Sequence, residues 1–164
     1  MPTSFAQHSR VPGLALRYHL WVAAPRVVID TNVLVSAVLR RESYNRSVLR
    51  ACFEDRLKPM VGHTLFLEYE DVLGRGALFQ KSPLSKLDRQ RFFESFLSVC
   101  EWVRVYYLWR PNLRDEGDNH ILELAVAGGA SIIVTKNTAD FSGANLRFPD
   151  IRALSPRDVL KELA

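Results

Sequence analysis

The most informative stretch of this sequence is Val27-Val28-Ile29-Asp30-Thr31-Asn32-Val33-Leu34, in which a β-branched run leads directly into a helical pattern. A run of this kind is typical of a strand that is buried in a parallel sheet. From Thr31 to Leu39 the apolar residues recur at helical spacing, so a helix is expected to follow the strand at once. Asp30 stands at the junction, where its carboxylate could cap the helix or belong to a site beyond the end of the strand.

The same alternation of short apolar runs and helical patterns continues along the chain. The expected strands cover 27–29, 57–61, 103–108, 131–135 and 151–154, and the expected helices cover 31–39, 43–55, 63–73, 87–102, 118–127 and 156–163. This order predicts an α/β fold, namely a three-layer α/β/α sandwich with a mainly parallel central sheet. Residues 1–25 carry no such pattern and are expected to be an N-terminal extension to a single domain at 26–164.

Three of these helix boundaries rest on local signals. Ser43 is a plausible N-cap for the helix that follows it. The pair Gly128-Gly129 is expected to close the helix at 118–127, since glycine favours the position just after a helix. Ser155-Pro156-Arg157-Asp158 is a capping box with proline at the first helical position, which predicts the start of the final helix.

Composition places the chain among globular proteins. Of its 164 residues, 48% are hydrophobic and 24% are charged, and the formal net charge is +4. This mildly basic balance allows a nucleic-acid partner without requiring one. Cys52 and Cys100 belong to no paired motif, which indicates buried, reduced thiols and a cytoplasmic location. No apolar run reaches the roughly 18 residues of a membrane helix, so no membrane association is expected.

Acidic residues recur near the ends of the apolar segments. Asp118 begins a helix and shares a face with Ile121 and Leu122, whereas Glu123 is expected to point to solvent. Asp118 could equally be an acid that caps the helix or complements its dipole.

The remaining acids are less distinctive when each is taken alone. Glu68 and Glu70 lie at opposite borders of the apolar face of 63–73, so helical spacing does not choose between them. Asp140 follows the expected strand at 131–135 in a loop, where an aspartate is unremarkable. Several carboxylates in one fold repel one another unless a positive charge sits among them, which favours a divalent-cation site and phosphate chemistry. The sequence has no GxSxG, Walker A or GxGxxG motif and no zinc-like histidine spacing.

An ordered series of motifs resembles the PIN-domain ribonucleases, and most of all the compact prokaryotic toxins of toxin–antitoxin pairs. The motifs are Val27 to Leu34, Glu68-Tyr69 with Val72-Leu73, Asp115-Glu116-Gly117-Asp118-Asn119, and Val134-Thr135-Lys136-Asn137 with Asp140-Phe141. The match runs from about Arg26 to the C-terminus. It implies a PIN-like form of the α/β sandwich.

The resemblance also implies a site for Mg²⁺ or Mn²⁺ and favours Glu68 over Glu70. Many family members carry an aspartate where Asn137 stands, so Asp140 could take the fourth acidic position, or Asn137 could bind the metal through its amide oxygen. The implied catalytic residues are Asp30, Glu68, Asp118 and Asp140, and the implied metal ligands are the same residues with Asn137. The residues expected to orient ligands and water are Thr31, Asn32, Asp115 and Thr135.

The implied activity is metal-assisted hydrolysis of phosphodiester bonds in single-stranded RNA by the toxin of a toxin–antitoxin pair. Besides RNA, the expected partners are a small antitoxin and a second copy of this chain. The candidates for contact with RNA phosphates are Arg40, Arg41, Arg46 and Lys136, although a basic run is usually a solvated face. The dimer could use an exposed patch of aromatic residues, or these residues could fill one core: Phe53, Phe66, Tyr69, Phe79, Phe92, Phe93 and Phe96.

Two other functions compete with the nuclease. One is a catalytically weak or silent PIN fold that binds RNA or a protein partner, which the asparagine at position 137 allows. The other is a receiver-like signalling domain, which also carries acids at strand ends. That domain needs adjacent acids at its first strand and a central phosphoacceptor aspartate, whereas here the first strand ends in Asp30 alone and no aspartate follows 57–61. It therefore ranks below the nuclease.

Overall fold

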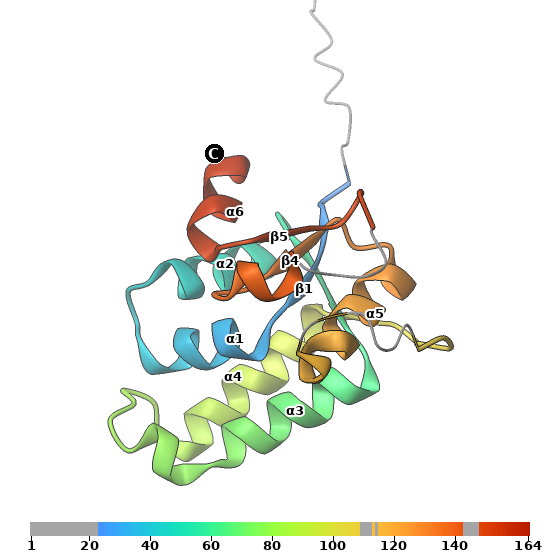
Figure 1. Cartoon of the computed structure of the whole chain (residues 1–164). Helices are drawn as coiled ribbons and strands as arrows, with labels where there is room; N and C mark the ends of the chain where they lie inside the picture. Colours follow the sequence, from blue (N-terminus) through green and yellow to red (C-terminus); the bar gives the residue numbers. More distant parts are fainter. Residues whose placement is uncertain (1–22, 109–112, 114, 143–147) are drawn as a thin grey trace, which may run out of the picture.

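The computed structural model describes residues 23–108, 113, 115–142 and 148–164. Its centre is a five-stranded sheet in the order β3-β2-β1-β4-β5, and all neighbouring strands are parallel (Figure 1). The strands are β1 Arg26–Ile29, β2 Lys58–Val61, β3 Glu101–Trp102, β4 Ile132–Val134 and β5 Arg152–Leu154. The expected extension at 1–25 lies outside the described residues except for 23–25.

Helices cover both faces of this sheet (Figure 1). They are α1 Thr31–Leu39, α2 Tyr44–Phe53, α3 His63–Gly74, α4 Lys86–Val99, α5 Asn119–Gly128 and α6 Pro156–Leu163, with short 3-10 turns η1 Gly76–Phe79, η2 Glu116–Asp118 and η3 Thr138–Phe141. α5 packs against β1, β2 and β4, whereas α2 packs against α1, α4 and α6. The chain moves outward from β1 to β3 and then returns past β1 to β4, so right-handed crossovers place α5 on the opposite face from α1 and α2. The expected three-layer sandwich with a parallel sheet is confirmed.

The local signals at the helix ends are confirmed as well. The Ser43 side chain accepts a hydrogen bond from the Arg46 backbone N–H at the start of α2. Gly129 follows α5 in the left-handed conformation with φ of 62°, which glycine adopts without strain. The Ser155 hydroxyl accepts a bond from the Asp158 backbone N–H and opens α6. In the part of the chain that the structure describes, no helix is both long and apolar enough to cross a membrane.

One expected strand is wrong. The sequence pattern predicts a strand at 103–108 and a helix at 87–102, but α4 ends at Val99 and β3 covers only Glu101–Trp102. The backbone N–H of Val103 still donates to the carbonyl of Val61 at 2.8 Å. Beyond that bond the neighbouring strand has ended, because Gly62 caps α3. Residues 103–108 therefore have strand-like composition but no strand beside them.

Most of the seven aromatic residues that the sequence offered as a patch or a core are buried or half-buried. Tyr69, Phe79, Phe93 and Phe96 are buried, Phe66 and Phe92 are half-buried, and Phe53 is 38% exposed. The rings of Tyr69 and Phe96 lie 6.2 Å apart in an edge-on contact. The expected alternative, an exposed patch made by these residues, is therefore wrong. Among the described residues, the three most exposed large apolar side chains lie instead after β3, at Tyr106, Tyr107 and Leu108.

Candidate functional site

The candidate site lies where two central strands end. β1 is flanked by β2 and β4. The connection after β1 leads to β2 on one side, whereas the connection after β3 leads to β4 on the other side, so the carboxyl ends of β1 and β4 form a topological switch point. Ile29 is paired with Val134, which brings the next residues, Asp30 and Thr135, side by side. The Thr135 hydroxyl donates to Asp30 Oδ2 at 2.6 Å. The two strand ends therefore meet at one edge of the sheet.

Asp30 is nearly enclosed by hydrogen-bond donors. It is 7% exposed, and its carboxylate accepts bonds from the Asn32 backbone N–H at 3.2 Å and from Asn32 Nδ2 at 2.7 Å. It thereby caps α1 as well as facing the site. Burial raises the pKa of Asp30 above its ordinary value, and the charge of Glu68 adds to this, although the bonds from Thr135 and Asn32 oppose it. The ionised carboxylate thus lacks full compensation by positive charge.

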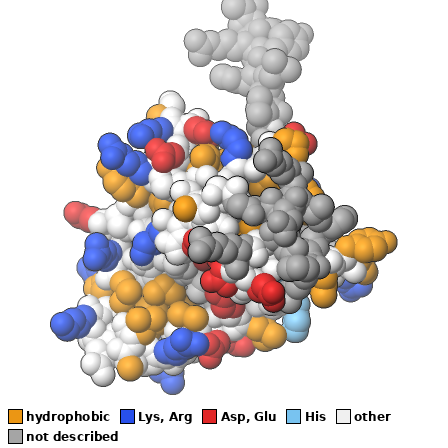
Figure 2. All heavy atoms as spheres, viewed as in Figure 1, with side chains coloured by type: hydrophobic (Ala, Val, Ile, Leu, Met, Phe, Trp, Pro, Cys, Tyr) orange, Lys and Arg blue, Asp and Glu red, His pale blue; other side chains and the backbone are white. Residues whose placement is uncertain are grey.

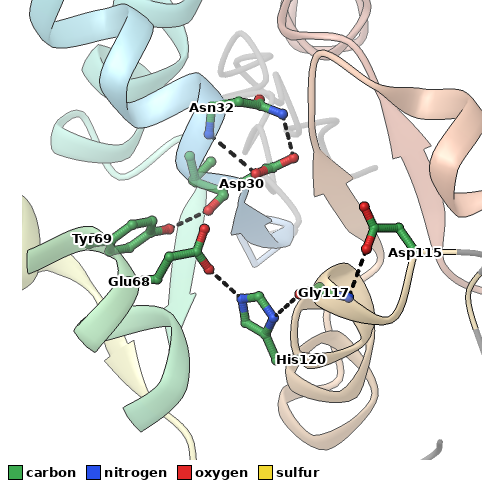
Figure 3. A network of polar contacts seen from close by, with 8 residues as sticks. Asp30, Asn32, Glu68, Tyr69, Asp115, Gly117 and His120 are labelled. Carbon is green, nitrogen blue, oxygen red and sulfur yellow. Dashed lines mark hydrogen bonds and ion pairs between the residues drawn. The ribbon is translucent and has the colours of Figure 1, made fainter. Parts of the chain in front are cut away.

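α3 brings Glu68 to the same place. The Tyr69 hydroxyl donates to the carbonyl of Ile29, so α3 is anchored to the last residue of β1. Glu68 is half-buried and turns toward Asp30 and His120, whereas Glu70 is exposed (Figure 3). A hydrogen bond from His120 holds the pKa of Glu68 below its ordinary value despite burial, and the Thr31 hydroxyl acts in the same direction. The structure therefore places Glu68, and not Glu70, beside the end of β1.

His120 is a residue whose place the sequence did not indicate. Its Nε2 lies 2.7 Å from Glu68 Oε2, its Nδ1 lies 2.7 Å from the carbonyl oxygen of Gly117, and its side chain is 12% exposed. Glu68 is an anion and the Gly117 carbonyl can only accept, so both contacts favour the protonated imidazolium form of His120. Burial lowers the pKa of His120, but the bond and charge of Glu68 outweigh it and the net shift is upward. The place of His120 in the sequence, two residues after Asp118, does not predict its contact with Glu68, because that contact depends on how α3 packs against α5.

The loop before α5 supplies further acids. Burial, followed by the charges of Asp30, Asp115 and Asp140, raises the pKa of Asp118 to about 6. Asp115 is exposed and accepts a bond from the Gly117 backbone N–H at 2.9 Å. Figure 3 shows Asp30, Glu68 and Asp115 around one space, and Figure 2 shows acidic side chains gathered near the middle of the face it presents. We call Asp30, Glu68, Asp115, Asp118 and Asp140 the acidic cluster.

The two candidates for the remaining position lie in different surroundings. Asp140 lies in η3, is half-buried, and acts electrostatically on Asp118. Asn137 is exposed, and its backbone N–H donates to Thr135 Oγ1 at 3.0 Å. Asp140 is therefore the one whose charge reaches the acidic cluster.

Two polar residues of α5 are buried. Glu123 is 2% exposed, so the prediction that it points to solvent is wrong. The cause is that α5 is covered on more than one side, by the sheet and by α3. Asn119 is fully buried, and its Oδ1 accepts a bond from the Leu113 backbone N–H at 2.9 Å. It ties the start of α5 to Leu113 and so helps to position the acids of the preceding turn.

The expected RNA-contacting residues fall into two groups. The Arg46 guanidinium donates to the carbonyl of Ala37 at 2.7 Å and lies 5.0 Å from the centre of the Phe92 ring, so it is engaged in the fold. Arg40 and Arg41 are exposed beyond the end of α1. Lys136 is exposed and donates from Nζ to Ser36 Oγ at 3.1 Å on α1. The exposed residues remain candidates for contact with a ligand.

The carboxylate oxygens of the acidic cluster suit a hard cation, but the side chains are not arranged to bind one. Across the described ranges, no group of three or more acidic, histidine or cysteine side chains is arranged to hold a metal ion. The contacts supply the reason: Asp30 is engaged by Asn32 and Thr135, and Glu68 is engaged by His120. Carboxylate oxygens are nevertheless the ligands that Mg²⁺ and Mn²⁺ prefer.

Comparisons with known proteins agree with the fold. A family model described as PIN domain matches residues 26–139. The chain resembles VapBC2 from Rickettsia felis bound to a DNA fragment from their promoter, with a TM-score of 0.54 and 16% identity over 79% of this chain and 98% of that chain. It also resembles PAE2754 from Pyrobaculum aerophilum, with a TM-score of 0.54 and 14% identity over 85% and 96% of the two chains. For DNA-bound VapBC from Salmonella typhimurium the TM-score is 0.53, with 15% identity over 80% and 98%. A comparison with curated proteins found no significant match.

Proposed function

This chain belongs to the PIN-domain family, and we propose that it is a Mg²⁺- or Mn²⁺-dependent ribonuclease that hydrolyses phosphodiester bonds in single-stranded RNA. The observation that supports the proposal most is the convergence of carboxylates from four separate segments on the ends of β1 and β4. Such a set is costly to keep ionised without a cation. A receiver-like domain is disfavoured by the strand order, since those domains have the order 2-1-3-4-5.

We assign the metal to Asp30, Glu68, Asp118 and Asp140. When bound, the ion supplies a Lewis acid and a water of lowered pKa. Thr135 and Asn32 hold the Asp30 carboxylate in one orientation, and Tyr69 fixes the distance between α3 and β1. The chain needs no side-chain nucleophile for this chemistry.

His120 has a specific consequence for metal binding. It donates to the carboxylate that a metal would need, so an ion must displace the imidazolium from Glu68. The imidazolium partly neutralises the acidic cluster in the metal-free protein, because the charge of His120 opposes the raised pKa of both Asp30 and Asp118. His120 and the metal therefore compete for one carboxylate.

The variant His120→Ala is expected to bind Mn²⁺ about tenfold more tightly, because a charged hydrogen bond to Glu68 no longer has to be broken. Calorimetric titration of the metal-free protein measures this change. His63→Ala, which alters an exposed histidine at the start of α3, is the matched control and should leave the affinity unchanged. Unchanged or weaker Mn²⁺ binding by His120→Ala would show that Glu68 is not a ligand of the metal.

The direct test of the proposed function is cleavage of a labelled single-stranded RNA by the purified protein. We expect cleavage with Mn²⁺ or Mg²⁺, its loss with EDTA, and its return when metal is added in excess. Double-stranded RNA of the same sequence is the control substrate. RNA that is bound but stays intact at millimolar metal would favour the alternative of a silent RNA-binding module, which the engagement of Glu68 by His120 makes the second candidate.

The biological setting follows from the family resemblance. We propose that the chain is a cytoplasmic toxin that associates with a small antitoxin and with a second copy of itself. Two of the similar solved structures, from Rickettsia felis and Salmonella typhimurium, are VapBC proteins bound to DNA, which supports a partner of that kind. Exposed apolar side chains such as Tyr44 and Leu87 are available for such contacts.

A further inference from the structure

A hollow lies beside the acidic cluster. It has a volume of about 710 Å³ and lies between the first turn of α3, the segment that follows β3, and the first turns of α5. His120 lines it and at the same time contacts Glu68 of the acidic cluster. The hollow and the candidate site therefore share one side chain as a common wall. We call this hollow the side groove.

The outer wall of the side groove is an aromatic segment with alternating exposure. From 102 to 106 exposed residues alternate with half-buried ones, and the half-buried Val103 and Val105 pack against the core. Trp102, Arg104 and Tyr106 therefore share the solvent-facing side of one extended segment. Trp102 is 56% exposed and Tyr106 is 77% exposed, values unusual for rings in a globular domain. In Figure 1 this segment follows β3 and projects from the molecule near α5.

The sequence pattern of this segment is that of a strand, but the fold leaves it unpaired. Gly62 permits the close approach of the segment to α3, because a Cβ on that glycine would lie 3.1 Å from Leu124 and 3.3 Å from the Val103 carbonyl. The segment is thus held near α3 and α5 at its start, while its aromatic side chains stay in solvent. Packing accounts for part of the Trp102 ring, which contacts Phe66, but Tyr106 is 77% exposed, and an exposed ring of this kind is available to a ligand.

We propose that the side groove binds the bases of single-stranded RNA that extends from the acidic cluster, with Tyr106 and Trp102 as stacking surfaces and Arg104 contacting the backbone. This inference rests on the proposed function and adds to it the place where the substrate is held. Exposed aromatic rings that alternate with a cation are the recurring means of binding single strands without regard to sequence. An RNA contact is favoured over a protein contact because the groove shares His120 with the acidic cluster, beside which the substrate of the proposed reaction lies. The charges agree as well, since Arg104 is exposed whereas Glu123, the acid that lines the groove, is buried.

Binding can be measured separately from cleavage. An Asp118→Asn background slows turnover, and fluorescence anisotropy in EDTA then reports the affinity for a labelled single strand of about ten nucleotides. Tyr106→Ala is expected to raise the Kd about tenfold, the effect of losing one stacked base. Tyr106→Phe should bind as tightly as the parent, because it keeps the ring, whereas Tyr106→Leu should bind as poorly as Tyr106→Ala. Arg104→Ala should weaken binding and reduce its dependence on salt.

The control is Tyr44→Ala, which removes a ring that is 58% exposed on α2 and does not line the groove. Trp102→Ala is less suitable alone, because the Trp102 ring lies 5.4 Å from that of Phe66 and its removal would disturb packing. RNA affinity that is unchanged in Tyr106→Ala, or retained in Tyr106→Leu, would overturn the proposal and point to a protein partner instead. Binding that depends on Tyr106 without cleavage in the parent protein would support the groove and refute only the nuclease. Cleavage by the parent protein together with RNA binding that does not depend on Tyr106 would support the nuclease and refute the groove.

Discussion

Asp118→Asn is expected to reduce RNA cleavage by about 10²–10³-fold, the cost of removing one essential group from a preorganised charged site. The same change should stabilise the metal-free protein. Burial and the neighbouring acids raise the pKa of Asp118 to about 6, so its ionised form is disfavoured in the fold at neutral pH. Removing this disfavoured charge is expected to raise the free energy of unfolding by about 1–2 kcal/mol after solvent screening is allowed for. This corresponds to about 2–8 °C in melting temperature.

The sign of the stability change follows from the direction of the shift. When an acid has a higher pKa in the folded state than in the unfolded state, the free energy of unfolding falls as the pH rises from the unfolded pKa through the folded pKa. This loss of stability is complete near neutral pH. Asparagine carries no charge and is as good as aspartate at a helix N-cap, where Asp118 makes no side-chain bond. Cleavage assays and thermal melts without metal measure both effects. Normal cleavage by purified Asp118→Asn protein would refute the assignment of the site.

Asp30→Asn provides an informative contrast. It should also abolish cleavage, but it should destabilise the fold by about 1–3 kcal/mol. The carboxylate accepts bonds from Asn32 and Thr135 on both of its oxygens, and an amide would turn one acceptor into a donor that faces another donor. Glu116→Gln, a change at an exposed acid in η2, is the neutral control for both variants.

Mn²⁺ is expected to raise the melting temperature of the parent protein, and Glu68→Gln is expected to lose most of that rise. A ligand that binds only the folded state stabilises it by about 2.7 kcal/mol at a hundred times its Kd. For a domain of this size that corresponds to about 5–10 °C. Glutamine keeps the volume of Glu68 and can still accept a bond from His120, so the fold should survive while a charged ligand is lost.

Glu70→Gln is the matched control for this experiment. It makes the same chemical change two residues away on α3, at a position that is exposed rather than turned toward Asp30. The full Mn²⁺ shift should therefore persist in Glu70→Gln. An equal shift in both variants would show that Glu68 does not hold the metal, and no shift in the parent protein at millimolar Mn²⁺ would contradict a metal site altogether.

Local signals in the sequence were sufficient for most of the architecture. The β-branched run before Asp30, the cap at Ser155 and the left-handed Gly129 each depend on residues within a few positions, and all are found as expected. The α/β order of elements then limits the arrangement to few topologies, because crossovers are right-handed and parallel strands end on one edge of the sheet. The sequence therefore placed Asp30 and Thr135 at strand ends on one edge of the sheet, whereas the strand order of the fold decided that β1 and β4 are neighbours and that the two residues meet.

Contacts between distant segments were needed for the rest. The segment 103–108 has the composition of a strand, but a strand needs a neighbour, and β2 ends at Val61. Helical periodicity assumes one buried face, so it misplaced Glu123 on a helix that is covered on more than one side. The pairing of Glu68 with His120 joins α3 to α5 and leaves no mark in the spacing of either helix. Local conformation is encoded by near neighbours, whereas the charge state and partners of the site depend on which segments the packed fold brings together.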